Sequence, residues 1–182
     1  HLELGVGPGT FVPRPETELL VDEALAALAG RPGRPTVVDL CTGSGALALA
    51  IATERPGTDV VAVELSEAAL GQARANAAAL ADALARVGST VDVVAGDATV
   101  VAALEGPLAR WRGRVDVVVS NPPYIPDGMV PRDPEVRDHD PHAALFGGPD
   151  GLAVVRPLVA QAALLLRPGG LLIAGTPQRP VY

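Results

Sequence analysis

The chain has 182 residues, the size of a single domain, and 48% of them are apolar, which is enough for a hydrophobic core without disulfides or metals. It contains 14 arginines, 21 acidic residues and no lysine, which excludes a lysine-dependent Walker A phosphate loop and Schiff-base chemistry on a lysine. The net charge of −7 also disfavours autonomous nucleic-acid binding, because neutralisation of phosphates supplies most of that affinity.

Strand-like apolar runs alternate with helix-like segments, which predicts an α/β fold with a mostly parallel sheet and helices on both faces. In the first half we expect a helix over residues 16–29, a strand over 36–40, a helix over 45–54 and a strand over 60–64. Ser66 is the expected N-cap of the next helix, because its hydroxyl can accept a hydrogen bond from a free amide of the first turn. That helix runs to about residue 79, or as far as 85.

In the second half we expect a strand over residues 91–95, weak helix over 99–111 with an interruption at Gly106-Pro107, and a strand over 115–120. A long irregular stretch rich in Pro, Asp and Gly follows over 121–149, and stretches of this length are usually either functional or mobile. A helix over 151–166, ended by Pro168 and two glycines, and a strand over 171–174 complete the pattern.

The first strand leads into an acidic and glycine-rich turn, Asp39-Leu40-Cys41-Thr42-Gly43-Ser44-Gly45, in which glycines allow a tight backbone and close approach of a ligand. Glu64 is the last residue of the second strand, where a carboxylate can accept hydrogen bonds from two ribose hydroxyls. These features fit S-adenosyl-L-methionine or a nicotinamide dinucleotide, and a turn without a ligand is the third alternative. Asp39 favours S-adenosyl-L-methionine, because a carboxylate suits its ammonium group and would repel a pyrophosphate. The candidate cofactor residues here are Asp39, Cys41, Thr42, Gly43, Ser44, Gly45 and Glu64.

The third strand is followed by Gly96-Asp97-Ala98. The Asp97 carboxylate can accept a hydrogen bond from an adenine amine, so we add Asp97 and Ala98 to the candidate cofactor residues. A simple Gly-Asp turn is the competing interpretation.

The fourth strand is followed directly by Asn121-Pro122-Pro123-Tyr124, in the place where parallel α/β sheets bind ligands. The two prolines fix the backbone and remove two amide donors, which leaves carbonyl acceptors and the Asn121 oxygen beside an aromatic ring. This set suits a planar NH2 group, because its two hydrogens need two acceptors and its π system needs a flat neighbour. We therefore take Asn121, Pro122, Pro123 and Tyr124 as the candidate catalytic residues, with Asn121 also lying against the cofactor.

No group of His, Asp or Glu residues has the spacing of a metal site, and His139 and His142 fall in the irregular stretch, where a solvated role is the simpler interpretation. Cys41 is the only cysteine, which excludes a disulfide or a cysteine-based zinc site within one chain. With no signal peptide or membrane-spanning run in the sequence, we expect a cytoplasmic setting.

Asn-Pro-Pro-Tyr after the fourth strand, together with the acidic glycine-rich turn, resembles the Rossmann-like class I methyltransferases that modify planar amines. Two further stretches, Phe11 to Glu18 and Ala144 to Leu152, resemble the HemK/PrmC family in particular. This resemblance implies S-adenosyl-L-methionine as cofactor and transfer of a methyl group to the glutamine amide nitrogen in the Gly-Gly-Gln motif of peptide chain release factors. It implies a release factor as partner and neither a nucleic acid nor a membrane.

The resemblance also implies a division into a lead-in segment and helix over residues 1–35 and a catalytic domain over 36–182. Ala174-Gly175 stands where the family has a Glu-His-Gly turn, and we expect the sheet to lack the family's last two strands. Three alternatives stay open at this point. They are a nucleic-acid exocyclic-amine methyltransferase, a dinucleotide oxidoreductase, in which Asn121 to Tyr124 would have no role, and a module that binds S-adenosyl-L-methionine without turnover.

Overall fold

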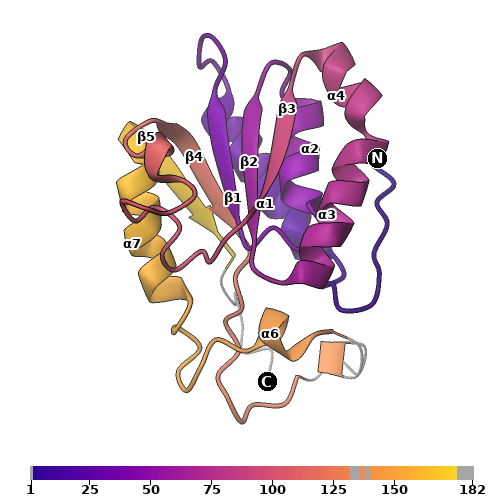
Figure 1. Cartoon of the computed structure of the whole chain (residues 1–182), viewed down its shortest axis with the longest axis vertical. Helices are drawn as coiled ribbons and strands as arrows, with labels where there is room; N and C mark the ends of the chain where they lie inside the picture. Colours follow the sequence, from indigo (N-terminus) through magenta and orange to yellow (C-terminus); the bar gives the residue numbers. More distant parts are fainter. Residues whose placement is uncertain (1, 132–135, 138–139, 176–182) are drawn as a thin grey trace.

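Five parallel strands form one sheet in the order β3-β2-β1-β4-β5 in a computed structural model that describes residues 2–131, 136–137 and 140–175 (Figure 1). The strands are β1 (Thr36–Leu40), β2 (Asp59–Glu64), β3 (Thr90–Ala95), β4 (Val115–Ser120) and β5 (Leu166–Ala174). The described part of the chain adds one isolated bridge, between Ile125 and Phe146. The predicted α/β class is therefore confirmed, and the strand order reverses between β1 and β4, where such folds open a crevice.

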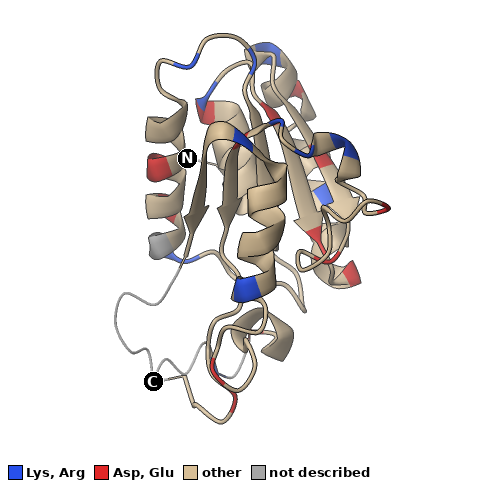
Figure 2. Ribbon diagram, turned by 90° about the vertical axis from the view of Figure 1, so that its left-hand side faces the viewer, with Lys and Arg blue, Asp and Glu red and all other residues tan. Residues whose placement is uncertain are grey.

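Helices cover both faces of the sheet, because alternate strand residues point to opposite sides. They are α1 (Pro15–Leu28), α2 (Ala46–Glu54), α3 (Glu67–Ala79), α4 (Ala81–Val87) and α7 (Val155–Leu165). The short α6 (His142–Leu145) lies beyond the carboxyl ends of the strands, and a 3-10 turn, η1, spans Ala109–Trp111 (Figure 1). Val37 and Val117 pack toward α1 and α2 on one face, and Val38 and Val118 pack toward α7 on the other. Charged residues lie mostly on the helices and loops around the strands (Figure 2).

The helix before β1 belongs to the same core as the sheet. Val21, Ala24 and Leu28 of α1 are buried in a cluster with residues of α2, β1 and β4. Burial of these side chains fixes α1, and with it the segment 11–14 that leads into the helix, beside the carboxyl ends of the strands. None of the helices described is long and apolar enough to span a membrane.

Most predicted boundaries agree with the structure to within one residue, and Ser66 is the N-cap of α3, accepting from the Ala69 amide at 3.5 Å. The prediction of a weak helix over 99–111 was wrong. That segment forms turns with only η1 at its end, because Gly106 packs on the Val101 carbonyl and the Leu108 amide donates to the same oxygen at 3.0 Å. The helix that Ser66 begins, α3, ends at Ala79, and a separate helix, α4, begins at Ala81.

Two further predictions need correction near the end of the described chain. The last helix begins at Val155 instead of residue 151, because Gly151 closes a turn on the Gly148 carbonyl. The last strand begins at Leu166, which pairs with Val115, and the Pro168-Gly169-Gly170 run forms a bulge within it instead of a loop before it. The irregular stretch over 121–149 contains α6, while its residues 132–135 and 138–139, His139 among them, lie outside the described residues.

Candidate functional site

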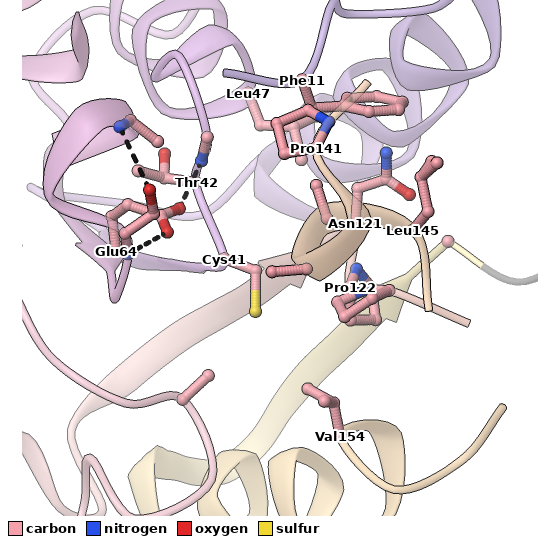
Figure 3. Close-up of a pocket in the computed structure, with 18 of the residues that line it drawn as sticks. Phe11, Cys41, Thr42, Leu47, Glu64, Asn121, Pro122, Pro141, Leu145 and Val154 are labelled. Carbon is pink, nitrogen blue, oxygen red and sulfur yellow. Dashed lines mark hydrogen bonds between the residues drawn. The ribbon is translucent and has the colours of Figure 1, made fainter. Parts of the chain in front are cut away.

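A cavity of about 1070 Å³ lies at the carboxyl ends of the strands, between the glycine-rich turn and the segment that follows β4 (Figure 3). Most of the predicted site residues line it, and these are Cys41, Thr42, Gly43, Ser44, Glu64, Asp97, Ala98, Asn121, Pro122, Pro123 and Tyr124. Asp39 and Gly45 do not line it. The structure therefore brings together residues that follow four different strands.

The turn between β1 and α2 is built on left-handed backbone conformations at Cys41, Gly43 and Gly45, with φ of 61°, 59° and 86°. A side-chain carbon at Gly43, which lines the cavity, would meet nothing within 4 Å, whereas one at Gly45 would stand 3.3 Å from the Leu49 side chain and 3.6 Å from Ala73. Gly43 thus leaves room for a ligand, and Gly45 allows α2 to pack closely on α3.

Glu64 is held in place by backbone amides. One carboxylate oxygen accepts from the Gly43 amide at 2.8 Å, and the other accepts from the amides of Leu65 at 2.9 Å and Ser66 at 2.8 Å (Figure 3). A carboxylate has about four lone-pair positions, so it can accept further hydrogen bonds from ligand hydroxyls. Glu64 therefore joins the glycine-rich turn to the end of β2 and still offers acceptors to the cavity.

Asp39 lies beneath the turn instead of at the ligand surface. Its side chain is fully buried, and one oxygen accepts from the Thr42 hydroxyl and from the Ala48 amide at 3.2 Å. The other oxygen has no hydrogen-bond partner among the described residues. Burial, opposed by these two hydrogen bonds, raises the pKa of Asp39 to about 7. Asp39 thus supports the turn from below, and its proposed contact with an ammonium group stays a prediction.

Cys41 and Asp97 both line the cavity. Burial, reinforced by the charges of Glu64 and Asp39, raises the pKa of Cys41 to about 12, so this half-buried thiol stays protonated and is not a nucleophile at neutral pH. One Asp97 oxygen accepts from the amide and the hydroxyl of Thr99, at 2.8 and 2.7 Å, which fixes the carboxylate at the end of β3.

The Asn121 side chain lies close to the backbone at the end of β5. A side-chain carbon at Gly175 would stand 2.6 Å from Asn121 Oδ1, and the Gly175 amide donates to the Ser120 carbonyl at 2.9 Å. Only a glycine at position 175 leaves the Asn121 amide in this place. The next residues are supported by a parallel bridge, in which the Ile125 amide donates to the Leu145 carbonyl at 2.9 Å.

Some cavity residues that the sequence did not indicate come from the start of the chain, and others, such as Pro141 and Leu145, come from the segment after β4. Phe11, Pro13, Arg14 and Thr17 line the cavity, and Figure 3 shows Phe11 beside Pro141 above the Asn121 side chain. The buried hydroxyl of Thr17 has no hydrogen-bond partner among the described residues, and the same holds for the Ser44 hydroxyl. A threonine near the start of a helix usually indicates capping. The position of Thr17 in the sequence therefore gave no sign that this residue lines the cavity.

A family model identifies the family of this chain, and a solved structure establishes its fold. The model of the methyltransferase small domain family matches residues 15–132. The chain belongs to this family. Its fold is that of class I methyltransferases, as in the rRNA methyltransferase AviRa from Streptomyces viridochromogenes, with a TM-score of 0.63 at 21% identity over 97% of this chain and 81% of that one. A likeness at this identity establishes the fold alone.

Among curated relatives within the family, the release factor glutamine methyltransferase of Mycolicibacterium smegmatis is 55% identical over 93% of this chain. That of Streptomyces coelicolor is 51% identical over 95%. The 4-amino-L-phenylalanine/4-methylamino-L-phenylalanine methyltransferase of Streptomyces pristinaespiralis is 41% identical over 92%. The chain spans about half the length of these relatives, namely 54%, 57% and 54%. The resemblance inferred from the motifs is confirmed.

Proposed function

We propose that this protein transfers a methyl group from S-adenosyl-L-methionine to the side-chain amide nitrogen of the glutamine in the Gly-Gly-Gln motif of peptide chain release factors. The observation that carries the proposal is the placement of Asn121-Pro122-Pro123-Tyr124 in one cavity with the glycine-rich turn and Glu64. The names of the relatives support the substrate. Within the proposal, residues 1–35 are the lead-in segment and residues 36–182 the catalytic domain.

The residues of the cavity fit S-adenosyl-L-methionine. The open space at Gly43 accommodates the methionine part, Glu64 would accept from the ribose hydroxyls, and Asp97 would accept from the adenine amine. The buried, unpartnered hydroxyls of Thr17 and Ser44 are donors suited to the cofactor carboxylate. A ligand that accepts from them removes the free-energy cost of leaving these two groups unpaired.

When bound, the cofactor supplies an electrophilic methyl group on a sulfonium. An amide nitrogen is a weak nucleophile, because its lone pair is delocalised into the carbonyl. Asn121 Oδ1 and the Pro122 carbonyl can accept its two hydrogens and hold the lone pair toward the methyl group. Both acceptors would also stabilise the positive charge that grows on nitrogen. The protein thus contributes orientation, which supplies several kcal/mol in such reactions.

A protein substrate agrees with the electrostatics of the chain. The protein carries a net charge of −7 and has no lysine, whereas proteins that bind nucleic acid by themselves depend on neutralised phosphates. A release-factor substrate places the activity in the cytoplasm, where translation ends. The proposal therefore includes a release factor as the partner and requires no nucleic acid, membrane or metal.

The deciding experiment incubates the protein with a release factor and isotopically labelled S-adenosyl-L-methionine, followed by mass spectrometry of the peptide that contains Gly-Gly-Gln. We expect one labelled methyl group on the glutamine and none on a control release factor whose glutamine is replaced by glutamate. Label on RNA or DNA instead would favour the nucleic-acid alternative. Cofactor binding without transfer to either would favour a binding module.

A further inference from the structure

An ion pair joins two segments that lie 126 residues apart in the sequence. The Arg14 Nη2 atom stands 2.8 Å from Asp140 Oδ2, and the Val12 amide donates to Asp140 Oδ1 at 3.4 Å. The Arg14 guanidinium also stands over the Phe11 ring, with 5.7 Å between its central carbon and the ring centroid. One carboxylate thus holds the segment before α1 at two points.

Asp140 is the most buried acid among the ion pairs described, although the Arg31–Asp116 pair is also largely buried, at 17% and 13% exposed. The Asp140 side chain is 1% exposed and that of Arg14 is 23% exposed, whereas the Arg156–Asp150 pair is 64% and 51% exposed. Exposed pairs contribute little to stability, but a buried carboxylate that loses its partner is left without compensation for its lost hydration. Without Arg14, the Asp140 carboxylate would keep only the Val12 amide among its described partners.

The pair lies at the end of the cavity that holds the predicted acceptors. Phe11 and Pro13, which flank Val12, line the cavity, as does Pro141, which follows Asp140. In Figure 3, Phe11, Pro141 and Leu145 surround the Asn121 side chain, while Thr42 and Glu64 lie at the other end. Asp140 itself does not line the cavity. Because prolines on both segments restrict the backbone, movement at the ion pair is passed on to the cavity wall.

We propose that Arg14 and Asp140 are positioning residues that join segments 11–14 and 140–145 into one wall, against which the substrate amide is aligned on Asn121. The inference rests on the proposed function, because it assumes that this end of the cavity receives the substrate. Neither residue is required to touch the reacting atoms. Loss of the pair separates the two segments and loosens the alignment. The cofactor end is unchanged, because Gly43 and Glu64 belong to other segments and Thr17 lies on α1, which its own core contacts hold in place.

The test compares Arg14→Gln, Asp140→Asn and the double variant with the wild-type protein. We expect kcat/KM for the release factor to fall roughly 10- to 100-fold in each single variant, the scale of small misplacements of reacting groups. We expect calorimetry to give a cofactor Kd within about threefold of the wild-type value, which is less than a tenfold change in affinity. Since the residues act as a pair, the double variant should lose no more than either single variant. Arg156→Gln is the matched control, because it removes an exposed pair and should leave kcat/KM unchanged.

Amide hydrogen exchange gives a second measurement that does not depend on activity. Asp140→Asn should speed exchange at Val12 and in residues 142–146 together and leave residues 42–45 unaffected. Single variants that keep the wild-type kcat/KM, losses that simply add in the double variant, or unchanged exchange in both segments would each overturn the inference. A wild-type protein that does not methylate a release factor refutes the proposed function, and the exchange measurement then decides separately whether the pair joins the two segments.

Discussion

The segment after β4 is supported by a glycine contact whose disruption has a calculable effect. A side-chain carbon at Gly147 would stand 2.7 Å from the Pro123 carbonyl oxygen and 2.6 Å from that of Gly151. Ordinary van der Waals contact begins near 3.4 Å, so in Gly147→Ala these oxygens must move by about 0.7 and 0.8 Å. Gly147 has an ordinary backbone conformation, so the effect is steric. Overpacking of this kind costs about 1–3 kcal/mol of stability.

The same displacement reaches the predicted acceptors, because Pro123 follows Pro122 directly. A misplacement approaching 1 Å costs about 100-fold in rate. We therefore expect Gly147→Ala to slow methyl transfer in single-turnover assays by roughly 10- to 100-fold and to leave the cofactor Kd within about threefold.

The matched control is Gly71→Ala in α3, where an added side chain meets nothing within 4 Å. Removing a glycine from a helix interior should stabilise the protein by about 0.5–1 kcal/mol and leave transfer unchanged. A Gly147→Ala protein with wild-type stability and wild-type transfer would show that the contact does not position the loop.

Three other predictions address the remaining parts of the site. Glu64→Ala should weaken cofactor binding by about 1.5–3 kcal/mol in calorimetry, and equal affinities would contradict the assignment. Asn121→Ala should slow single-turnover transfer about 100-fold and leave the cofactor affinity within about threefold of wild type. Asn121→Asp should retain part of the activity, and wild-type rates in both variants would rule out the acceptor role. Because burial raises the pKa of Asp39 from 3.8 to about 7, the folded state binds the extra proton and the free energy of unfolding falls as the pH rises across that window. Asp39→Asn should remove this decline in urea denaturation at about pH 5 and about pH 8, and parallel profiles would contradict it.

The central strands β1, β2 and β4 were predictable because each is a mostly apolar run that is buried on both faces, whereas the edge strands β3 and β5 are partly exposed. The core strands β1 and β4 agree with their predicted residues, and the glycine-rich turn lies where the pattern placed it. Segment 99–111 was not predictable, because its buried residues Val101 and Leu108 are fixed by packing against the sheet and not by a helical period. The early start of β5 depends on pairing between Leu166 and Val115, which residue patterns alone do not show.

The residue types of the candidate site were predictable, but their orientation was not. Asp39 lies within strand β1. Only the structure of this strand shows that the Asp39 side chain points under the turn, toward Thr42 and Ala48. Thr17 and Arg14 reach the cavity because burial of α1 against the sheet brings the preceding segment to the strand ends. Such contacts depend on tertiary packing, which has no local signal in the sequence.

The two ends of the cavity differ in how much chain must be folded before each exists. The bond between the Gly43 amide and Glu64 spans 21 residues and needs only two neighbouring strands, whereas the ion pair between Arg14 and Asp140 spans 126 residues. The entropy lost on closing a loop grows with its length, and contacts distant in sequence form late. The end that carries Gly43 and Glu64 can therefore form early in folding, and the opposite wall forms only after nearly the whole sheet has assembled.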